Sequence, residues 1–476
     1  MKAPSTSTTF AALVLMLVLS GLDQTILSTA LPGIVSALQG RDLAPWVFSA
    51  YLLASTAVIP LYGKLADRFG VRPLLLTATA MFVMGSLACA AATDMRALVG
   101  ARALQGLGGG GLMTLTMLAV AALYPASERP RRMGLLGAAY GISTLVGPLV
   151  GGMLLEAASW QWAFLINLPG SLLALVVLSQ APFGAPPPPR HRLDLAGALL
   201  LAAALVALLL ATRHGAEGGD PAVAAPASIF APVSAVILLA GWVVVERRAE
   251  DPVVPLTLFR IPTFAVAAAL SVLSGVALFT AVVFLPLYLQ QGLGMGAIRS
   301  ALHTLPLMLG ITVGGQVAGR ALRAGLAPRR LAGFAALGLT LGFALLCWTL
   351  HRAHTLDWAL SGALLPVGLG LGLLFPLVTV LSQRSAPLTH IGTATATPVM
   401  LRALGGALGV AFLGEGLRQH MARAALAGLH SQTEATQALA AGVGSLCAWA
   451  AGTGVLALLV SRALPAPALA HGTVTG

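Results

Sequence analysis

Residues 63–73 read Gly-Lys-Leu-Ala-Asp-Arg-Phe-Gly-Val-Arg-Pro, a short charged segment that joins two long apolar runs. The preceding run covers residues 45–65 and the following run covers residues 73–93. Each run has the ~20 residues that an α-helix needs to cross the hydrocarbon core of a bilayer. Two such runs with a short polar connection predict a pair of membrane-spanning helices that run in opposite directions.

The rest of the chain repeats this pattern. Of its 476 residues, 58% are hydrophobic and 9% are charged, and the mean hydropathy is +0.90. Soluble globular proteins carry about 25% charged residues, so this composition excludes an ordinary soluble enzyme, and it equally excludes a disordered chain. The apolar runs predict an all-α polytopic membrane protein with fourteen spans, at residues 10–33, 45–65, 73–93, 97–123, 134–156, 160–181, 193–211, 228–246, 262–290, 299–319, 331–350, 356–382, 392–416 and 437–461.

The distribution of Lys and Arg predicts the orientation of these spans. If the N-terminus lies inside, the inner segments hold 18 of these residues and the outer segments hold 7, while Arg102 and Arg402 lie within spans. Because cytoplasmic loops are enriched in Lys and Arg, we expect a protein of the cell membrane with both termini in the cytoplasm. The same loops explain the net charge of +12 without nucleic acid as a partner. The first run contains Asp23 and lacks a small-residue cleavage site, so we do not expect a cleaved signal peptide.

Two features predict how the spans are divided. A run of four prolines at residues 186–189 follows the sixth span and forms a stiff linker. The Gly, Ala and Arg positions of residues 63–68 recur in residues 315–320, at an offset of 252 residues. We therefore expect two pseudo-symmetric six-helix bundles and two inserted helices. The expected bounds are 1–181 for the first bundle, 182–260 for the linker and inserted helices, 261–464 for the second bundle and 465–476 for a cytoplasmic tail.

Residues 63–73 resemble the cytoplasmic loop signature of the major facilitator superfamily. Residues 22–32, 102–106, 141–152 and 160–170 look like further motifs of the 14-span drug:proton antiporter branch of that superfamily, in the expected order. The resemblance implies the major facilitator fold and export of small lipophilic substrates in exchange for protons. It implies no cofactor, because the proton gradient is the source of energy.

Within the loop signature, the resemblance implies a latch that forms in one access state and breaks in the other. Asp67 has the chemistry for it, since a carboxylate accepts hydrogen bonds at a helix end or pairs with a nearby Arg. The alternative is a positively charged loop with one incidental acid. The expected latch consists of Gly63, Lys64, Asp67, Arg68, Gly70 and Arg72.

The fifth span is rich in glycine at four-residue spacing, which allows helices to pack closely in lipid. By resemblance, the same segment controls leakage and the direction of antiport, beyond its role in packing. The expected antiporter residues are Gly141, Gly147, Pro148, Gly151 and Gly152.

Asp23 is the only carboxylate well inside a predicted span, and Arg102 lies at a similar depth in the fourth span. Ionisable groups within the membrane are costly and usually functional. We expect Asp23 to carry the proton, with Arg102 modulating it and Gln105 orienting the guanidinium or a water molecule. The alternative is a static Asp–Arg pair that only stabilises packing.

Aromatic side chains and one further embedded cation are candidates for an adaptable apolar cavity. Their orientation is open, because each could equally face lipid or packed helices. The candidate substrate cavity comprises Trp46, Tyr51, Tyr140, Phe279, Phe284, Tyr288 and Arg402.

Other classes of function fit the sequence less well. A membrane enzyme needs several converging His, Asp or Glu residues, and a channel or receptor does not need the loop signature. Residues 106–111 match a dinucleotide-binding string, but they lie inside an apolar span rather than after a strand. The cysteines lie singly in apolar stretches, so no metal site is expected.

We predict a monomeric, proton-coupled multidrug exporter of neutral or cationic lipophilic compounds; the alternative is an exporter of an endogenous lipid or metabolite.

Overall fold

The protein is all-helical wherever its structure, a computed structural model, describes it. The described residues are 4–40, 43–125, 128–157, 159–183, 194–214, 221–351, 357–426 and 432–464. Within these ranges, eleven helices are long and apolar enough to cross a membrane. All fourteen predicted spans coincide with helical segments, which confirms the predicted fold class. The number of actual membrane crossings, fourteen, stays a prediction.

The first half of the chain folds into one bundle, in which α4 packs between α2 and α3 and α5 packs along α1. A Ser5 side chain caps α1, and the Asp94 carboxylate caps α4 by accepting from the Ala97 amide. The helices of this half are α1 (Thr6–Leu38), α2 (Ala44–Phe69), α3 (Val71–Ala90), α4 (Met95–Leu123), α5 (Arg129–Ala157), α6 (Trp162–Leu165) and α7 (Asn167–Ser179).

Two further helices, α8 (Leu195–His214) and α9 (Pro221–Arg248), follow the first bundle and pack against each other. They coincide with the two predicted inserted helices. Helix α8 also contacts α2 and α16, one from each half of the molecule. A 3-10 turn, η2 (Leu256–Arg260), then leads into the second bundle.

The second half contains the longest helix, α16, together with two π-helical turns that flank a single turn of α-helix containing Pro286. A proline inside a helix removes a backbone hydrogen bond, which accounts for the irregular winding there. The elements of this half are α10 (Pro262–Phe279), η3 (Thr280–Phe284), α11 (Leu285–Leu287), η4 (Tyr288–Gly292), α12 (Ala297–His303), α13 (Leu305–Arg323), α14 (Pro328–His351), α15 (Asp357–Ser385), η5 (Leu388–His390), α16 (Ile391–Leu426) and α17 (Gln432–Ser461).

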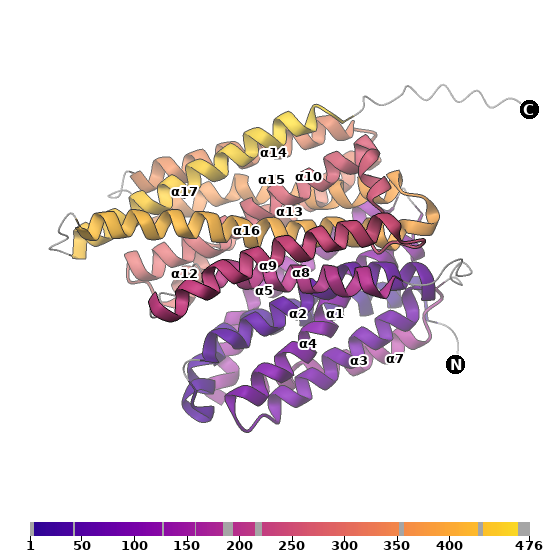
Figure 1. Cartoon of the computed structure of the whole chain (residues 1–476), viewed down its shortest axis with the longest axis horizontal. Coiled ribbons are helices and arrows are strands. Elements are labelled where there is room, and N and C mark those ends of the chain that lie inside the picture. The colour runs from indigo at the N-terminus through magenta and orange to yellow at the C-terminus, as the bar shows by residue number, and fades with distance from the viewer. Residues whose placement is uncertain are drawn as a thin grey trace, which may run out of the picture.

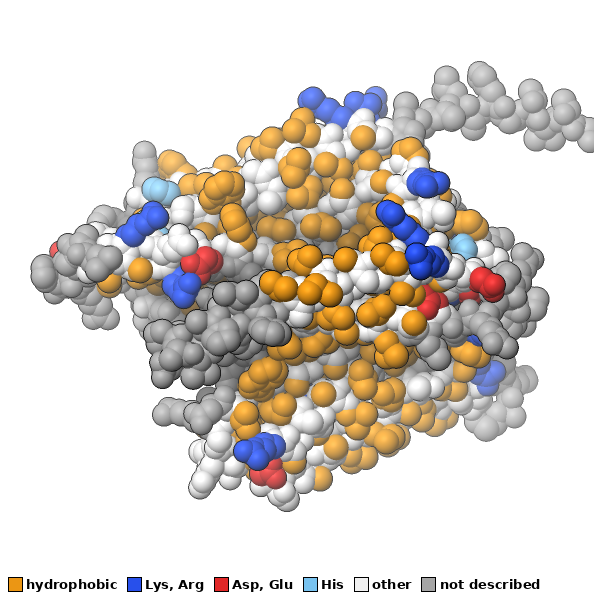
Figure 2. Space-filling view, in the orientation of Figure 1, with side chains coloured by type: hydrophobic (Ala, Val, Ile, Leu, Met, Phe, Trp, Pro, Cys, Tyr) orange, Lys and Arg blue, Asp and Glu red, His pale blue; other side chains and the backbone are white. Residues whose placement is uncertain are grey.

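The two halves lie side by side and meet along two helix pairs, α5 with α13 and α2 with α16 (Figure 1). Both the start of α1 and the end of α17 lie at one end of the molecule, which we call the terminal end (Figure 1). Toward the opposite end, α2 and α4 diverge from α16 and α17 in this view. Apolar side chains cover much of the visible body, and charged side chains gather near its two ends (Figure 2). This surface suits a lipid environment.

Glycines in α4 allow the close packing of the first bundle. A Cβ on Gly108 would lie 2.5 Å from the Phe82 amide nitrogen, and one on Gly110 would overlap the carbonyl oxygen of Ser55. The glycine-rich string of residues 106–111 is therefore a packing surface inside a helix, as expected, and has no strand before it.

We predict that Gly110→Ala destabilises the folded protein by about 1–3 kcal/mol, because overpacking forces two helix backbones apart. Gly100→Ala in the same helix is the matched control, since a Cβ there meets nothing within 4 Å. The midpoint of thermal unfolding in detergent measures the effect. Equal midpoints for the two variants would contradict this account of the glycine run.

Candidate functional site

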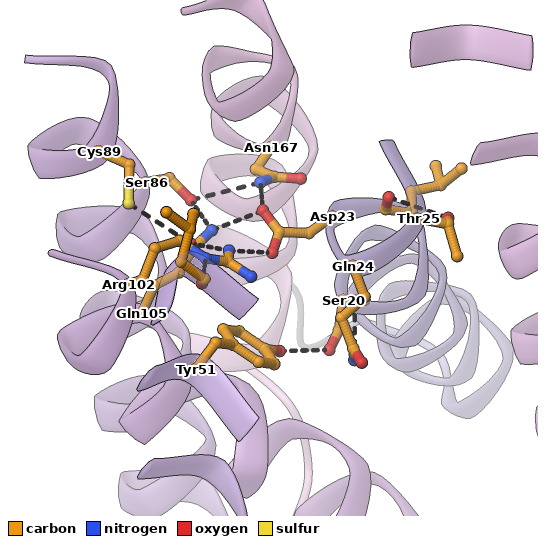
Figure 3. Close-up of polar contacts among 12 residues, drawn as sticks. Ser20, Asp23, Gln24, Thr25, Tyr51, Ser86, Cys89, Arg102, Gln105 and Asn167 are labelled. Carbon is orange, nitrogen blue, oxygen red and sulfur yellow. Dashed lines mark hydrogen bonds and ion pairs between the residues drawn. The ribbon is translucent and has the colours of Figure 1, made fainter. Parts of the chain in front are cut away.

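A buried ion pair joins α1 and α4 in the first bundle. Arg102 Nη1 lies 2.6 Å from Asp23 Oδ2, and both residues are at most 2% exposed. Figure 3 shows the two side chains pointing toward each other between their helices. The structure thus brings together the embedded acid and the nearby cation that the sequence singles out.

Amide side chains complete the surroundings of the Asp23 carboxylate. Gln105 Nε2 donates to Asp23 Oδ1 over 2.7 Å, and Asn167 Nδ2 donates to the same oxygen over 2.8 Å. Gln105 also accepts from Arg102 Nη1 at 2.5 Å and donates to Ser86 Oγ at 2.8 Å. Both carboxylate oxygens are therefore engaged, so a proton or a cation can reach Asp23 only if part of this network opens.

Arg102 is held on its remaining sides as well. Its Nε donates to the Val47 carbonyl over 3.1 Å, and its guanidinium carbon lies 4.5 Å from the centre of the Tyr51 ring. The Tyr51 hydroxyl lies 3.3 Å from Ser20 Oγ, one turn before Asp23. Tyr51 thus packs against the ion pair, whereas we expected it, from the sequence, among the candidates for the substrate cavity.

Sequence reasoning misses Asn167 and Ser86 as members of this network. Asn167 is the first residue of α7 and is fully buried, and Ser86 is fully buried in α3. The available signal is weak: each is a polar residue in an apolar segment, where a side chain needs a partner. Which partner it finds depends on helix rotation, and the apolar pattern of these segments does not specify that rotation.

Glycines of α5 bring this helix close to both halves. A Cβ on Gly147 or Gly151 would overlap the hydroxyl oxygens of Thr25 and Thr29 in α1, just after Asp23. On the other face, a Cβ on Gly141 would lie 3.5 Å from Thr312 Oγ1 in α13. Helix α5 therefore connects the Asp23 region with the second half. Two more expected antiporter residues belong to α5, but their environments lie outside the described part of the chain: Pro148 and Gly152.

Asp67, at the end of α2, binds the first turn of α16 in the other half. Its carboxylate accepts hydrogen bonds from the Gly392 amide at 2.6 Å, the Thr393 amide at 2.9 Å and Thr393 Oγ1 at 3.0 Å. The amides at the start of a helix lack intrahelical partners, and the helix dipole favours a negative charge there. This contact ties the two halves together at the terminal end.

The other residues of the loop signature surround this contact. Lys64 is 3% exposed and forms an ion pair with Asp251, which lies between α9 and η2. Burial, and to a smaller extent the nearby charge of Lys64, lowers the pKa of His390 in η5 and so favours its neutral form. Sequence reasoning misses Asp251 as a partner of the loop, because 187 residues separate it from Lys64.

Glycines permit the tight geometry of the loop signature. A Cβ on Gly63 would lie 2.8 Å from the Gly392 carbonyl oxygen, and Gly70 joins α2 to α3 with a φ of 84°, a conformation that favours glycine. The guanidinium of Arg68 lies 5.6 Å from the Phe69 ring, and Arg72 is exposed.

The internal repeat has a structural counterpart. In the first half, Gly63 faces α16, and in the second half the matching Gly315 faces Gly134 of α5, with close backbone approach at both places. Each copy of the repeat therefore lies at a contact between the two halves, near the terminal end.

Arg402 lies in α16 and faces the first half. Its guanidinium carbon stacks 4.4 Å from the centre of the Phe375 ring, and it interacts electrostatically with Tyr140 of α5. The Tyr140 side chain in turn contacts Gln24, the neighbour of Asp23. Arg402 and Tyr140 thus meet between the halves, close to the ion pair.

The remaining cavity candidates lie in different places. Trp46 is half-buried in α2, and Phe279 packs against Gly406 of α16. Phe284 and Tyr288 are 4% and 3% exposed and belong to the hydrophobic core of the second half. The structure therefore groups Tyr140 and Arg402 at the interface between the halves and places Phe284 and Tyr288 away from it.

The described residues contain no cluster of three or more potential metal ligands. His303 is buried, and its Nδ1 lies 2.6 Å from Ser361 Oγ, which satisfies this side chain locally. Glu415 pairs with Arg418 at 2.6 Å near the surface. Among the described carboxylates, Asp23 is thus the one buried in the middle of the first bundle.

Comparison with known proteins identifies the family. A family model for the Major Facilitator Superfamily matches residues 13–410. The chain is 31% identical over 403 residues to the multidrug transporter protein MdtP of Bacillus subtilis (strain 168), covering 84% of this chain and 73% of that protein. It is 31% identical over 414 residues to multidrug resistance protein 3 of the same organism, covering 87% of this chain and 80% of that protein.

A further relative and two solved structures agree. The chain is 34% identical over 409 residues to the uncharacterized MFS-type transporter Rv1877 of Mycobacterium tuberculosis (strain ATCC 25618 / H37Rv), covering 85% of this chain but only 58% of that protein. Its fold matches the human organic anion transporter MFSD10 with a TM-score of 0.65 at 19% identity, covering 96% of this chain and all of that one. It matches the proton:xylose symporter XylE with the same score at 15% identity, covering 97% of each chain. The chain therefore belongs to the Major Facilitator Superfamily of multi-pass membrane transporters.

Proposed function

We propose that the protein exports neutral or cationic lipophilic compounds in exchange for protons, by alternating access. The observation that carries this proposal is the buried Asp23–Arg102 pair, enclosed by Gln105 and Asn167. An embedded carboxylate with switchable partners is suited to binding and releasing a proton, and it needs no nucleotide or metal. The named relatives are multidrug transporters, which supports multidrug export here.

The proposed coupling step is an exchange of partners at Asp23. Protonation removes the negative charge, so the carboxyl group no longer attracts Arg102, and the guanidinium then relies on the Val47 carbonyl, Gln105 and the Tyr51 ring. Loss of the proton restores the ion pair. Thr25 and Thr29 of α1 lie against the glycines of α5, so a small movement of α1 would displace α5. Because α5 also contacts α13, this displacement would change the interface with the second half.

The proposed conformational step separates the halves at the terminal end. We assign this end to the cytoplasm, because the predicted inner loops carry most of the Lys and Arg residues. The Asp67 contact with α16 and the close approach of Gly134 to Gly315 hold this end together. Breaking these contacts would open a path from the cytoplasm, whereas the structure described here has them formed. We expect a monomer in the cell membrane.

The second candidate function is export of an endogenous lipid or metabolite by the same mechanism. Half-buried Met113 and Met117 of α4 lie between Tyr140 and the α16 residues around Met400, and flexible thioether side chains adapt to varied apolar molecules. This observation favours a broad range of substrates. Comparing the lipid content and the drug resistance of a deletion strain separates the two candidates.

The decisive experiment uses purified protein in liposomes with an inwardly or outwardly directed pH gradient. We expect a lipophilic fluorescent substrate to move opposite to the proton flux, and its movement to stop when an ionophore collapses the gradient. Protein-free liposomes are the control for passive permeation. Substrate movement that is independent of the gradient would refute proton coupling.

We predict that neutral or monocationic lipophiles are exported in preference to permanent dications. Asp23 is the only carboxylate that the sequence places well inside a predicted span, which implies one proton per substrate. Export of a dication then moves a net positive charge outward against about 2.3 kcal/mol per 100 mV. Transport of a matched monocation and dication at a fixed pH gradient, with the potential varied by potassium and valinomycin, tests this. Dication export that does not respond to the potential would contradict it.

A further inference from the structure

Among the described residues, one of the arginines inside the predicted spans has no carboxylate partner. Asp23 is neutralised by Arg102, but Arg402 has no carboxylate within 4.0 Å and no hydrogen bond among the described residues. Its guanidinium instead stacks on the Phe375 ring and interacts electrostatically with Tyr140. An arginine in a low-dielectric interior is costly without a counter-charge, so a purely structural arginine would be paired.

Arg402 lies deep in the molecule, at the boundary between the halves. It lies eleven residues into α16, about 16 Å from the start of this helix at the terminal end. The side chains of Arg402, Phe375, Tyr140 and Gln24 are all half-buried, whereas the Asp23–Arg102 pair is at most 2% exposed. A cation without a carboxylate partner among the described residues, and not completely buried, therefore lies deep between the two bundles.

The neighbours of Arg402 suit one kind of molecule. A guanidinium offers a planar fork of donors that matches a carboxylate, and the Tyr140 hydroxyl can donate to the same group. Met113 and Met117 lie in the same hydrophobic cluster as Tyr140 and offer an adaptable apolar surface to the remainder of the molecule. We infer that Arg402 and Tyr140 form a binding site for the anionic group of a lipophilic monocarboxylate, which this transporter carries in addition to neutral and cationic compounds.

The inference rests on the proposed proton antiport for its energetics. If one proton enters as one monoanion leaves, two positive charges move inward per cycle. The pH gradient and an interior-negative potential then both assist export, more strongly than for a neutral compound. Bound anion would also supply the counter-charge that Arg402 lacks among the described side chains.

The test compares three probes that share one apolar body: pyrenebutyrate, its neutral methyl ester and the cation pyrenebutyltrimethylammonium. Binding to the purified protein is measured by the fluorescence of the pyrene group. We expect Arg402→Gln to weaken binding of pyrenebutyrate by about 10-fold to 100-fold, because it removes charge-assisted hydrogen bonds. Binding of the ester should change by less than about 2-fold, since an ester offers no charge to the guanidinium.

Two further variants sharpen the comparison. Arg402→Lys keeps the charge without the planar fork and should retain part of the affinity. Arg418→Gln removes one positive charge from an exposed site on the same helix and should leave all three affinities unchanged. A monodisperse profile in size-exclusion chromatography shows that each variant is folded.

The outcomes separate this inference from the proposed function. Equal binding of pyrenebutyrate to wild type and Arg402→Gln would overturn the anion site, even if the cation is exported in response to a pH gradient. Arg402-dependent binding of the carboxylate together with no gradient-driven transport of any probe would support the site and refute proton antiport. In liposomes, pyrenebutyrate export that requires a pH gradient and also increases with an interior-negative potential would support both.

Discussion

Replacing Asp23 with Asn is expected to abolish substrate transport driven by a pH gradient, down to the level of protein-free liposomes. The carboxylate is the proposed proton carrier, and Asn cannot take up or release a proton near neutral pH. Transport of a monocationic dye into liposomes that contain the purified protein, followed as quenching on imposing the gradient, measures this loss. A fully active variant would refute the assignment of Asp23.

The structure shows why this single substitution also affects stability. It leaves the Arg102 guanidinium buried at 1% exposure without its carboxylate partner, and breaking a buried pair in this way costs about 3–5 kcal/mol. Loss of transport could therefore reflect loss of folded protein. The double variant Asp23→Asn with Arg102→Gln removes both charges together and avoids the unpaired cation.

The double variant distinguishes coupling from folding. We expect it to be folded and to bind substrate, but to exchange labelled for unlabelled substrate without responding to the pH gradient. Asp23→Glu keeps a titratable carboxyl and should keep part of the gradient-driven transport. If the double variant retained full gradient-driven transport, the ion pair would have only a structural role.

The sequence predicts the fold of this protein well, because the apolar length of a span is a strong physical constraint. The predicted spans coincide with helical segments, including α8 and α9 between the bundles. The contact between Asp23 and Arg102 agrees with their predicted similar depth in the membrane. Depth follows from counting residues along a helix, so it can be read without a structure.

The sequence does not predict which residues face one another around a site. Helices such as α1 and α4 are apolar on nearly every side, so no amphipathic pattern shows their rotation. The apolar pattern therefore does not predict that Asn167 donates to Asp23. It equally does not predict that Asp67 binds backbone amides 325 residues away in α16. That Arg402 has no carboxylate partner among the described residues is likewise visible only in the structure.

Replacing Asp67 with Asn is expected to slow the transport cycle strongly while leaving substrate affinity nearly unchanged. Asn lacks the negative charge that the first turn of α16 favours, and its amide group adds donors opposite the Gly392 and Thr393 amides. Weakening this contact by about 2 kcal/mol shifts the balance between its closed and open forms by about 30-fold. Turnover and binding are measured separately, in liposomes and by fluorescence.

A distance measurement tests the conformational part of this prediction. Spin labels at the exposed positions of Arg72 and Arg384 lie on different halves, near the terminal end. Pulsed EPR should show a single short distance in wild type and a broader, longer distribution in Asp67→Asn. Thr393→Val removes one of the three hydrogen bonds and should give an intermediate distribution.

The matched control is the same Asp-to-Asn change at a helix N-terminus whose capping contact lies within one half of the molecule. Asp94 accepts from the Ala97 amide within α4 at 2.9 Å, and Asp94→Asn should alter neither turnover nor the label distances. The latch predicts a specific combination: reduced turnover, unchanged affinity and a longer distance in Asp67→Asn, with none of these changes in Asp94→Asn. Weaker substrate binding with unchanged turnover would instead place Asp67 in the binding site, although its carboxylate contacts the start of α16, about 16 Å along this helix from Arg402, and would refute the latch.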